Sequence, residues 1–591
     1  MWYKDYIREN IKQRNGDSYM NIRFLGAVKG VTGSSHLIRF KDKKILLDCG
    51  MFQGKDEELN EEVLEVNPSE IDYLLLSHSH IDHSGRIPLL VKNGFKGIIY
   101  CSKPTYDLCQ IMLVDSAHIQ ESEAEWKNRK AKRSGRKLVE PMYTQSDAIE
   151  SLKYFKPIFY DQVIHIEDDL TVKFNDAGHI LGSSIIEMWF EENRETTKLV
   201  YSGDLGMNEK PILKDPVIIE SADYVIMEST YGNRIHENIE QRTEELIEII
   251  LKTVRRGGSV IIPSFAVGRT QEIIYELNKY YDKKLSETGV KENELKKIPV
   301  YIDSPLATKA TEIFKANALV FDEEARNYIL GGDNPLEFEN LHFTQSAEES
   351  KALNFSDEPK IIISASGMCD AGRIKHHLKH NLWKKECSIV FVGYQAEGTL
   401  GRRIIDGEKD VKILGEEIHI NAEIYNVEGF SGHADKPALM KWLSGFKEKP
   451  KNVFIVHGET ESKEDFAKAV KKELGMNCIV PEYNVVYDIK PFEHVHEIRV
   501  DDKERHVSSD GLTLADENIG NTEKVVKKAN DDQIKELTKD VEELRKLFNN
   551  ALKLTEGSLK KDMELESLNK INNNIIEIEN EIINLTMLNG K

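Results

Sequence analysis

The stretch His78-Ser79-His80-Ile81-Asp82-His83 follows, after Ser77, the largely apolar run Ile71-Asp72-Tyr73-Leu74-Leu75-Leu76. A run of this kind that ends in polar residues predicts a buried strand whose C-terminal end opens into a loop. Imidazole and carboxylate groups suit zinc better than magnesium or calcium. His78 and His80 are two residues apart, so they project to one side of an extended chain. Asp82 and His83 lie further along the chain and can face a second ion. The alternative is a solvated polar loop that binds no metal.

The composition of the 591-residue chain sets the class of protein. Its length predicts two to four domains with a large buried core. The net charge of -21 argues against a protein that coats nucleic acid by diffuse electrostatics, so any polyanion site must be local. The six cysteines are scattered without a CxxC pair, which favours a reducing compartment. Because no apolar run reaches the length of a membrane span and the N-terminus carries charge throughout, we expect a cytoplasmic protein without membrane contact.

Strands that end in ligand-type residues recur along the chain. After a polar helical lead-in over residues 1–19, short runs over 21–26, 35–40 and 44–48 predict a β-meander, and Asp48 ends its third strand. Later apolar strands end in Gly178-His179 and in Ser202-Gly203-Asp204, where glycine allows tight turns. The sequence therefore predicts a common ligand set: His78, His80 and His179 for one ion, Asp82 and His83 for another, and Asp204 as a bridge between them.

These residues resemble the signature of the metallo-β-lactamase fold, a His-x-His-x-Asp-His loop followed by a later His and a later bridging Asp. Residues 225–232, 430–435 and 454–459 resemble the three extra motifs of the β-CASP subgroup, nucleases that act on RNA or DNA. Glu228 and the glycine-rich turn after residue 177 resemble the endonuclease of the mRNA cleavage and polyadenylation factor and its prokaryotic relatives more than ribonuclease J. The resemblance covers about residues 20 to 490.

The resemblance implies an α/β fold: a metallo-β-lactamase αββα sandwich with an inserted α/β β-CASP domain and a C-terminal helical hairpin. Alternating strand and helix patterns between 241 and 302 independently predict a parallel sheet in the insertion. We expect a lead-in over residues 1–19 and the two parts of the sandwich over 20–230 and 426–490, with the insertion over 231–425 between them. Residues 491–591 are expected to form a charged linker and a helical hairpin or coiled coil. The return from the insertion falls between 390 and 425.

The same resemblance implies a zinc-dependent endoribonuclease that hydrolyses RNA phosphodiester bonds with a hydroxide activated by two zinc ions per chain. Mn²⁺ is an expected substitute, and 5′–3′ exonuclease action is a second expectation. His457 completes the ligands of the second ion, and a histidine at this position implies RNA rather than DNA as the substrate. We expect that RNA to be single-stranded. We expect the catalytic residues to be His433 as general acid, Glu228 as its orienting partner, Asp82 as a ligand, and Asp48 as the group that fixes a ligand imidazole.

A strand, a glycine-containing turn and a helix are predicted over residues 360–378. Free N–H groups at a helix start bind anions, so Ser366 and Gly367 are expected to hold a backbone phosphate, with Arg373 or His376 adding charge. The alternative is a tight strand–helix connection with surface histidines. The basic run over 126–137 likewise is either a solvated face or a set of phosphate contacts.

Apolar residues recur at helical spacing over 534–551 and 568–585, beyond a charged stretch over 491–527. This pattern predicts an antiparallel hairpin or an intermolecular coiled coil, and with the latter a homodimer. The alternative is a hairpin that packs on its own domain.

Two other functions remain compatible with parts of the sequence. A small-molecule metallo-hydrolase of the same fold would not need Glu228, His433 or the inserted domain. A catalytically silent RNA-binding or scaffold subunit would lack metal ligands, and none of the expected ligands is missing.

Overall fold

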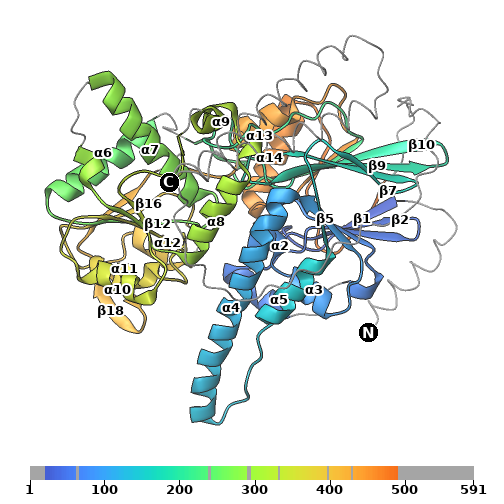
Figure 1. The fold of residues 1–591 in the computed structure, drawn as a ribbon. Coiled ribbons are helices and arrows are strands. Elements are labelled where there is room, and N and C mark those ends of the chain that lie inside the picture. The colour runs from blue at the N-terminus through green and yellow to red at the C-terminus, as the bar shows by residue number, and fades with distance from the viewer. Residues whose placement is uncertain are drawn as a thin grey trace, which may run out of the picture. The chain divides into compact units, whose positions relative to one another are not determined.

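The computed structural model describes residues 20–61, 66–236, 241–288, 294–330, 333–395, 398–427 and 430–489 (Figure 1). The lead-in over 1–19 and the predicted C-terminal hairpin with its homodimer contact lie outside these residues. Within the described residues, no helix combines the length and the apolar character that a membrane crossing requires.

The first of two seven-stranded sheets begins as the predicted β-meander. Strands β1, β2 and β3 pair antiparallel in chain order, and β3, β4, β5 and β6 then pair in parallel. Parallel neighbours need crossover connections, which short and long helices supply here. The sheet runs in the order β22 (Val486–Ile489), β1 (Met20–Phe24), β2 (His36–Phe40), β3 (Lys43–Leu47), β4 (Tyr73–Leu75), β5 (Ile98–Ser102) and β6 (Phe155–Ile158).

The second sheet packs against the first across one apolar core. Fully buried side chains from both sheets, such as Ile22, Phe40, Phe174 and Ile226, form this core. The alternation of buried and half-buried residues along β1 and β8 fits strands that bury one face between two sheets. The order is β21 (Cys478–Ile479), β20 (Asn452–Ile455), β11 (Tyr224–Met227), β10 (Glu195–Tyr201), β9 (Ser184–Glu192), β8 (Leu170–Asp176) and β7 (Val163–Glu167).

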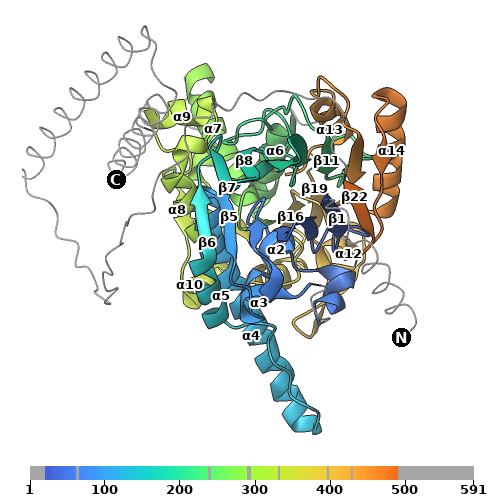
Figure 2. The ribbon, with the colours of Figure 1, turned by 90° about the vertical axis from the view of Figure 1, so that its right-hand side faces the viewer.

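Helices cover the outer faces of both sheets, as Figures 1 and 2 show. Leu90 and Leu113 lie in an apolar cluster under the first group of helices, and Trp442 and Phe466 lie in a separate one under the second group. The αββα sandwich is therefore confirmed. The first group is α2 (Ile81–Ser84), α3 (Ile87–Lys92), α4 (Lys103–Ser134) and α5 (Gln145–Ser151), and the second is α13 (Lys436–Leu443) and α14 (Thr460–Glu473).

The predicted insertion forms its own parallel six-stranded sheet between β11 and β20. Its order is β14 (Leu341–Phe343), β13 (Val300–Ile302), β15 (Ile361–Ser364), β12 (Val260–Pro263), β16 (Ser388–Phe391) and β19 (Glu423–Asn426). A two-stranded hairpin, β17 (Asp410–Ile413) and β18 (Glu416–His419), lies beyond β16 in the chain. The helices are α6 (Arg242–Arg255), α7 (Arg269–Thr288), α8 (Pro305–Ala316), α9 (Glu323–Leu330), α10 (Ala347–Phe355), α11 (Ile374–Asn381) and α12 (Leu400–Ile405).

The insertion leaves the second sheet continuous, because β20 pairs in parallel with β11 on the return of the chain. Every residue of β12, β15 and β16 in the insertion is buried, so these strands are covered on both faces. Continuous burial is typical of parallel strands that helices cover on both sides. The domain boundaries at 230 and 425 stay predictions.

Strand ends bring the candidate site together. Asp48 follows β3 and His78 closely follows β4, which pair in parallel in the first sheet. In the second sheet β10, β11 and β20 pair in parallel, and their carboxyl ends lead to Asp204, Glu228 and His457. Because the carboxyl ends of parallel strands meet at one edge of a sheet, side chains up to about 410 residues apart in the chain lie at the same place.

Candidate active site

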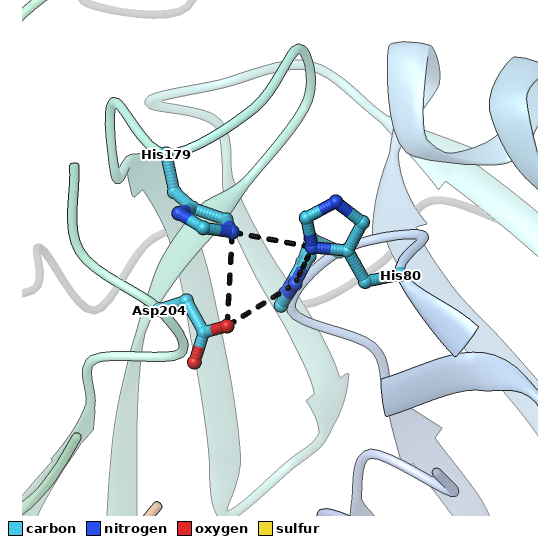
Figure 3. A group of neighbouring side chains, drawn as sticks. His80, His179 and Asp204 are labelled. Carbon is cyan, nitrogen blue, oxygen red and sulfur yellow. Dashed lines mark hydrogen bonds and ion pairs between the residues drawn. The ribbon is translucent and has the colours of Figure 1, made fainter. Parts of the chain in front are cut away.

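The first cluster of metal-ligand side chains joins the loop after β4 to the turns after β8 and β10. His80 Nδ1 lies 3.1 Å from His78 Nε2 and 3.2 Å from His179 Nε2. Asp204 Oδ2 lies 3.5 Å from His78 Nε2 and 3.7 Å from His179 Nε2. Figure 3 shows His80, His179 and Asp204 pointing toward one another. The cluster offers one ligand atom from each of four side chains to a single ion.

The second cluster adjoins the same carboxylate. His83 Nε2 is 3.1 Å from His457 Nε2 and 3.3 Å from Asp204 Oδ2. Asp82 Oδ2 lies 3.6 Å from His457 Nε2 and 3.9 Å from His83 Nε2. The structure thus brings together the two ligand groups that the sequence predicted, with Asp204 between them.

Two glycines allow the ligand turns to approach each other. A Cβ atom at Gly206 would lie 1.8 Å from the carbonyl oxygen of Gly178 and 2.8 Å from the amide nitrogen of His179. Gly178 itself has a φ of +64°, a conformation that side chains disfavour. The His179 and Asp204 turns can therefore meet only because both positions lack a side chain.

The chemistry of this donor set fits a divalent cation. Both carboxylate oxygens of Asp204 are buried and have no hydrogen-bond partner among the described residues, and an unpaired buried carboxylate is costly. Burial and the neighbouring His83 hold the pKa of His78 well below its usual value. Burial and His433 do the same for the pKa of His179. Burial lowers the pKa of His80 to about 4. Neutral imidazoles with a free lone pair beside an orphaned carboxylate are the ligands that zinc takes.

Hydrogen bonds on the far side of the rings fix which nitrogen faces the clusters. His179 Nδ1 donates to the carbonyl oxygen of Gly432 at 3.0 Å, which leaves the Nε2 lone pair for an ion. His83 Nδ1 donates to Asp48 at 2.7 Å with the same result. Burial opposes a charge on His83, but Asp204 and Asp48 raise its pKa well above the usual value, so this place attracts positive charge.

Asp48 is held in place by three further donors. Its carboxylate accepts from the amide of Ser77 at 2.7 Å, from the Ser77 hydroxyl at 2.8 Å and from the Tyr201 hydroxyl at 2.7 Å. Its backbone has a φ of +57° and that of His457 has a φ of +47°, both in the left-handed region that non-glycine residues rarely adopt. Such conformations persist only where surrounding contacts hold them, and they concentrate at functional sites.

His433 and Glu228 form a third group on the more open side of the site. His433 Nδ1 lies 3.3 and 3.2 Å from the two Glu228 oxygens, one of which also accepts from the amide of Leu205 at 2.6 Å. The His433 side chain is 22% exposed, whereas Glu228 is buried. Burial lowers the pKa of His433, but Glu228 and Asp204 outweigh it and raise that pKa overall. The carboxylates thus favour the protonated form of an imidazole that borders the two ligand clusters.

Sequence reasoning missed four side chains that support this site. Ser77 and Tyr201 hold Asp48, and Thr230 Oγ1 lies 3.1 Å from His457 Nδ1. Buried Lys210 donates to the carbonyl oxygen of His179 at 2.7 Å, and burial lowers its pKa to about 8. Tyr201 could have been found because it ends the strand before Ser202-Gly203-Asp204, but no local signal marks Lys210.

The predicted phosphate loop connects a strand to a helix. The order strand, turn and helix is as predicted: β15 ends at Ser364, and α11 begins at Ile374. In the turn between them, the Ser366 hydroxyl donates to the carbonyl oxygen of Ala371 and accepts from its amide. Arg373 donates to Asp303 at 2.6 Å and to the carbonyl oxygen of Gln345 at 2.8 Å, while His376 is exposed. Their phosphate contacts stay a prediction.

We expect Asp48→Asn to weaken zinc binding about 10- to 100-fold, because an amide cannot accept hydrogen bonds from His83, Ser77 and Tyr201 together. Competition with a zinc chelator measures this loss. Tyr201→Phe is the matched control, since it removes one donor and leaves the carboxylate. Equal losses in the two variants would contradict the role assigned to Asp48.

Three family models match successive parts of the chain. They are the "Metallo-beta-lactamase superfamily" over residues 28–249, the "Beta-Casp domain" over 270–404 and the "Zn-dependent metallo-hydrolase RNA specificity domain" over 417–481.

Curated relatives match across these three parts. "Ribonuclease TTHA0252" of Thermus thermophilus is 38% identical over 442 residues, which cover 75% of this chain and 94% of the relative. "Transcription termination factor FttA" of Methanocaldococcus jannaschii is 32% identical over 477 residues, covering 79% of this chain and 71% of the relative. The same factor of Methanosarcina mazei is 31% identical over 500 residues, covering 80% and 74%. The chain therefore belongs to the β-CASP family of metallo-β-lactamase ribonucleases.

Proposed function

We propose that this protein is a zinc-dependent endoribonuclease of single-stranded RNA, with 5′–3′ exonuclease action as a second activity of the same site. The observation that carries the proposal is the pairing of two ligand clusters across Asp204 with a histidine that Glu228 orients on the open side. The ribonuclease name of the Thermus thermophilus relative supports RNA as the substrate.

Each ligand cluster would hold one zinc ion, two per chain, with Mn²⁺ as a substitute. His78, His80 and His179 would hold the first, Asp82, His83 and His457 the second, and Asp204 would contact both. Zinc in such sites supplies Lewis-acid charge to a phosphoryl oxygen and a nucleophile at neutral pH. The protein must still protonate the leaving 3′ oxygen.

His433 is placed for that proton transfer. Glu228 fixes the ring through Nδ1, so Nε2 can carry a proton toward a leaving oxygen. The centre of the Tyr231 ring lies 6.0 Å from that of the His433 ring, in an edge-to-face arrangement. We assign His433 as the general acid, Glu228 as its positioning residue, and Asp48 as the positioning residue of His83.

An exposed aromatic ring near this site supports an unpaired, single-stranded substrate. Phe265, in the loop after β12, is 40% exposed. A Cβ at Gly367 would lie 3.0 Å from its ring, and one at Gly393 would lie 3.9 Å away. Next to Gly393, the ring of Tyr394 lies 6.3 Å from that of Tyr231, the neighbour of His433. Unpaired bases stack on such rings, so we propose that Phe265 holds a nucleobase near the cut site.

His433→Ala should lower kcat for cleavage of a labelled single-stranded RNA about 10²- to 10⁴-fold, because general acid catalysis is lost. Glu228→Gln should lower it less, since the imidazole is still present but less well oriented. Zinc content per chain should not change in His433→Ala. Single-turnover cleavage with metal analysis of the same samples measures both.

The ends of the products distinguish the mechanism. Attack on phosphorus from water leaves a 5′ phosphate and a 3′ hydroxyl. A 2′,3′-cyclic phosphate would contradict the proposal, because the ribose would then be the nucleophile. Intact RNA together with rapid turnover of a chromogenic small ester, unaffected by His433→Ala, would instead identify a small-molecule hydrolase.

Phe265→Ala should weaken binding of single-stranded RNA about 5- to 100-fold, because stacking of one base on an aromatic ring contributes ~1–3 kcal/mol. Hydrolysis of a small phosphodiester without a base should not change. Phe355→Ala is the matched control, since this ring is 76% exposed at the end of α10. Equal affinities of the two variants for RNA would exclude a stacking role for Phe265.

Several features beyond the site are also proposals. They comprise the domain boundaries at 230 and 425, phosphate contacts by the loop of Ser366 and Gly367, a cytoplasmic location, and a homodimer through the C-terminal helices that follow a charged linker within 491–591. If the hairpin dimerises the chain, truncation near residue 525 should halve the mass measured by light scattering. An unchanged mass would exclude this role.

A further inference from the structure

The C-terminal end of helix α4 and the turn after it form a strongly basic surface. We call residues 126–137 the basic tip. It contains seven cationic side chains and no carboxylate, and all seven are exposed: Lys127, Arg129, Lys130, Lys132, Arg133, Arg136 and Lys137. This local excess of positive charge contrasts with the net charge of -21 of the whole chain.

The cations of the basic tip have no ion-pair partner among the described residues. Elsewhere lysines and arginines commonly pair: at the start of the same helix, Lys103 lies 2.6 Å from Asp107. Like charges three or four positions apart on a helix repel each other and destabilise it. Lys132 and Arg133 lie in the last turn of α4, where the helix dipole favours positive charge. The seven cations together still repel one another, and a polyanion would relieve this repulsion.

Helix α4 connects the basic tip to the candidate active site. At its start, the hydroxyls of Ser102 and Thr105 donate to the carbonyl oxygen of Gly182 at 2.6 and 2.8 Å. Gly182 lies three residues after the ligand His179. With a rise of 1.5 Å per residue, Thr105 and Lys130 lie about 38 Å apart along the helix axis.

The distal half of α4 extends beyond the sheets in both views (Figures 1 and 2). The segment after the helix is fastened to it, because Asn128 and Val139 exchange two hydrogen bonds of 2.8 Å. Trp126 is 53% exposed, and Lys130 Nζ lies 3.4 Å from the centre of its ring. The projection is thus an ordered helix with cations and an aromatic ring at its end.

We propose that the basic tip binds the phosphate backbone of RNA, about 38 Å along α4 from the contact of this helix with the His179 turn, and so increases the affinity for long substrates. Cations beside an exposed aromatic ring are the combination that binds nucleic acid without sequence preference. The inference rests on the proposed ribonuclease function. At 3.4 Å per stacked nucleotide, the distance corresponds to about a dozen nucleotides, so short oligonucleotides cannot reach both places.

The test compares two triple variants of the full-length protein with the same change in net charge. The tip variant is Lys127→Gln, Lys132→Gln and Lys137→Gln, and the control variant is Lys385→Gln, Lys412→Gln and Lys472→Gln, exposed lysines outside the tip. Affinity for an RNA of about 40 nucleotides should fall about 10- to 100-fold in the tip variant only. The slope of log affinity against log salt should become shallower by about 0.7 for each lost phosphate contact.

Cleavage of an RNA of about six nucleotides should be equal in the wild type and both triple variants. Equal affinities of the two triple variants for the long RNA would overturn the inference, as would an equal loss on short and long RNA in the tip variant. If only binding to phosphatidylserine vesicles depended on the tip, the partner would be a membrane and the inference would fail. Absence of cleavage of any RNA by the wild type would contradict the proposed function instead, since long-RNA binding is measured separately.

Discussion

The unsatisfied carboxylate of Asp204 is the constraint on which the rest of the site depends. Its oxygens are buried without a hydrogen-bond donor among the described residues, yet imidazole nitrogens of His83, His78 and His179 lie 3.3 to 3.7 Å away. Removing a charge from water costs several kcal/mol unless an opposite charge compensates it. A cation on each side of the carboxylate would supply that compensation, and both clusters are shaped for it.

The architecture explains how residues from the whole chain reach this carboxylate. The first sheet supplies Asp48 and the His78 loop, and the second sheet supplies Asp204, Glu228 and His457. Because β20 pairs with β11, the large insertion does not displace His457 from its partners. The insertion also contacts the site itself: a Cβ at Gly268, next to the start of α7, would lie 3.2 Å from the side chain of Ile180, the neighbour of His179. The inserted domain thus borders the metal centre as well as the proposed base-stacking surface.

Much of the fold and of the ligand set could be predicted from the sequence, because both depend on local patterns. The apolar strand before His78, the glycines around His179 and Asp204, and the change from a hairpin pattern to alternating strand and helix are all visible within short windows. The supporting contacts were not predictable in this way. Tyr201 reaches Asp48 from the opposite sheet, so its role depends on how the two sheets pack. The hydrogen bonds between Ser366 and Ala371, which hold the turn before α11, likewise follow no periodicity.

X-ray diffraction from zinc-loaded crystals at the zinc absorption edge would test the central claim most directly, because anomalous scattering locates the ions without assumptions about the protein. The account predicts two peaks on either side of the Asp204 carboxylate. One should lie among His78, His80 and His179, and the other among Asp82, His83 and His457. A single peak, or peaks that do not contact Asp204, would contradict a centre in which this carboxylate joins two metal ions.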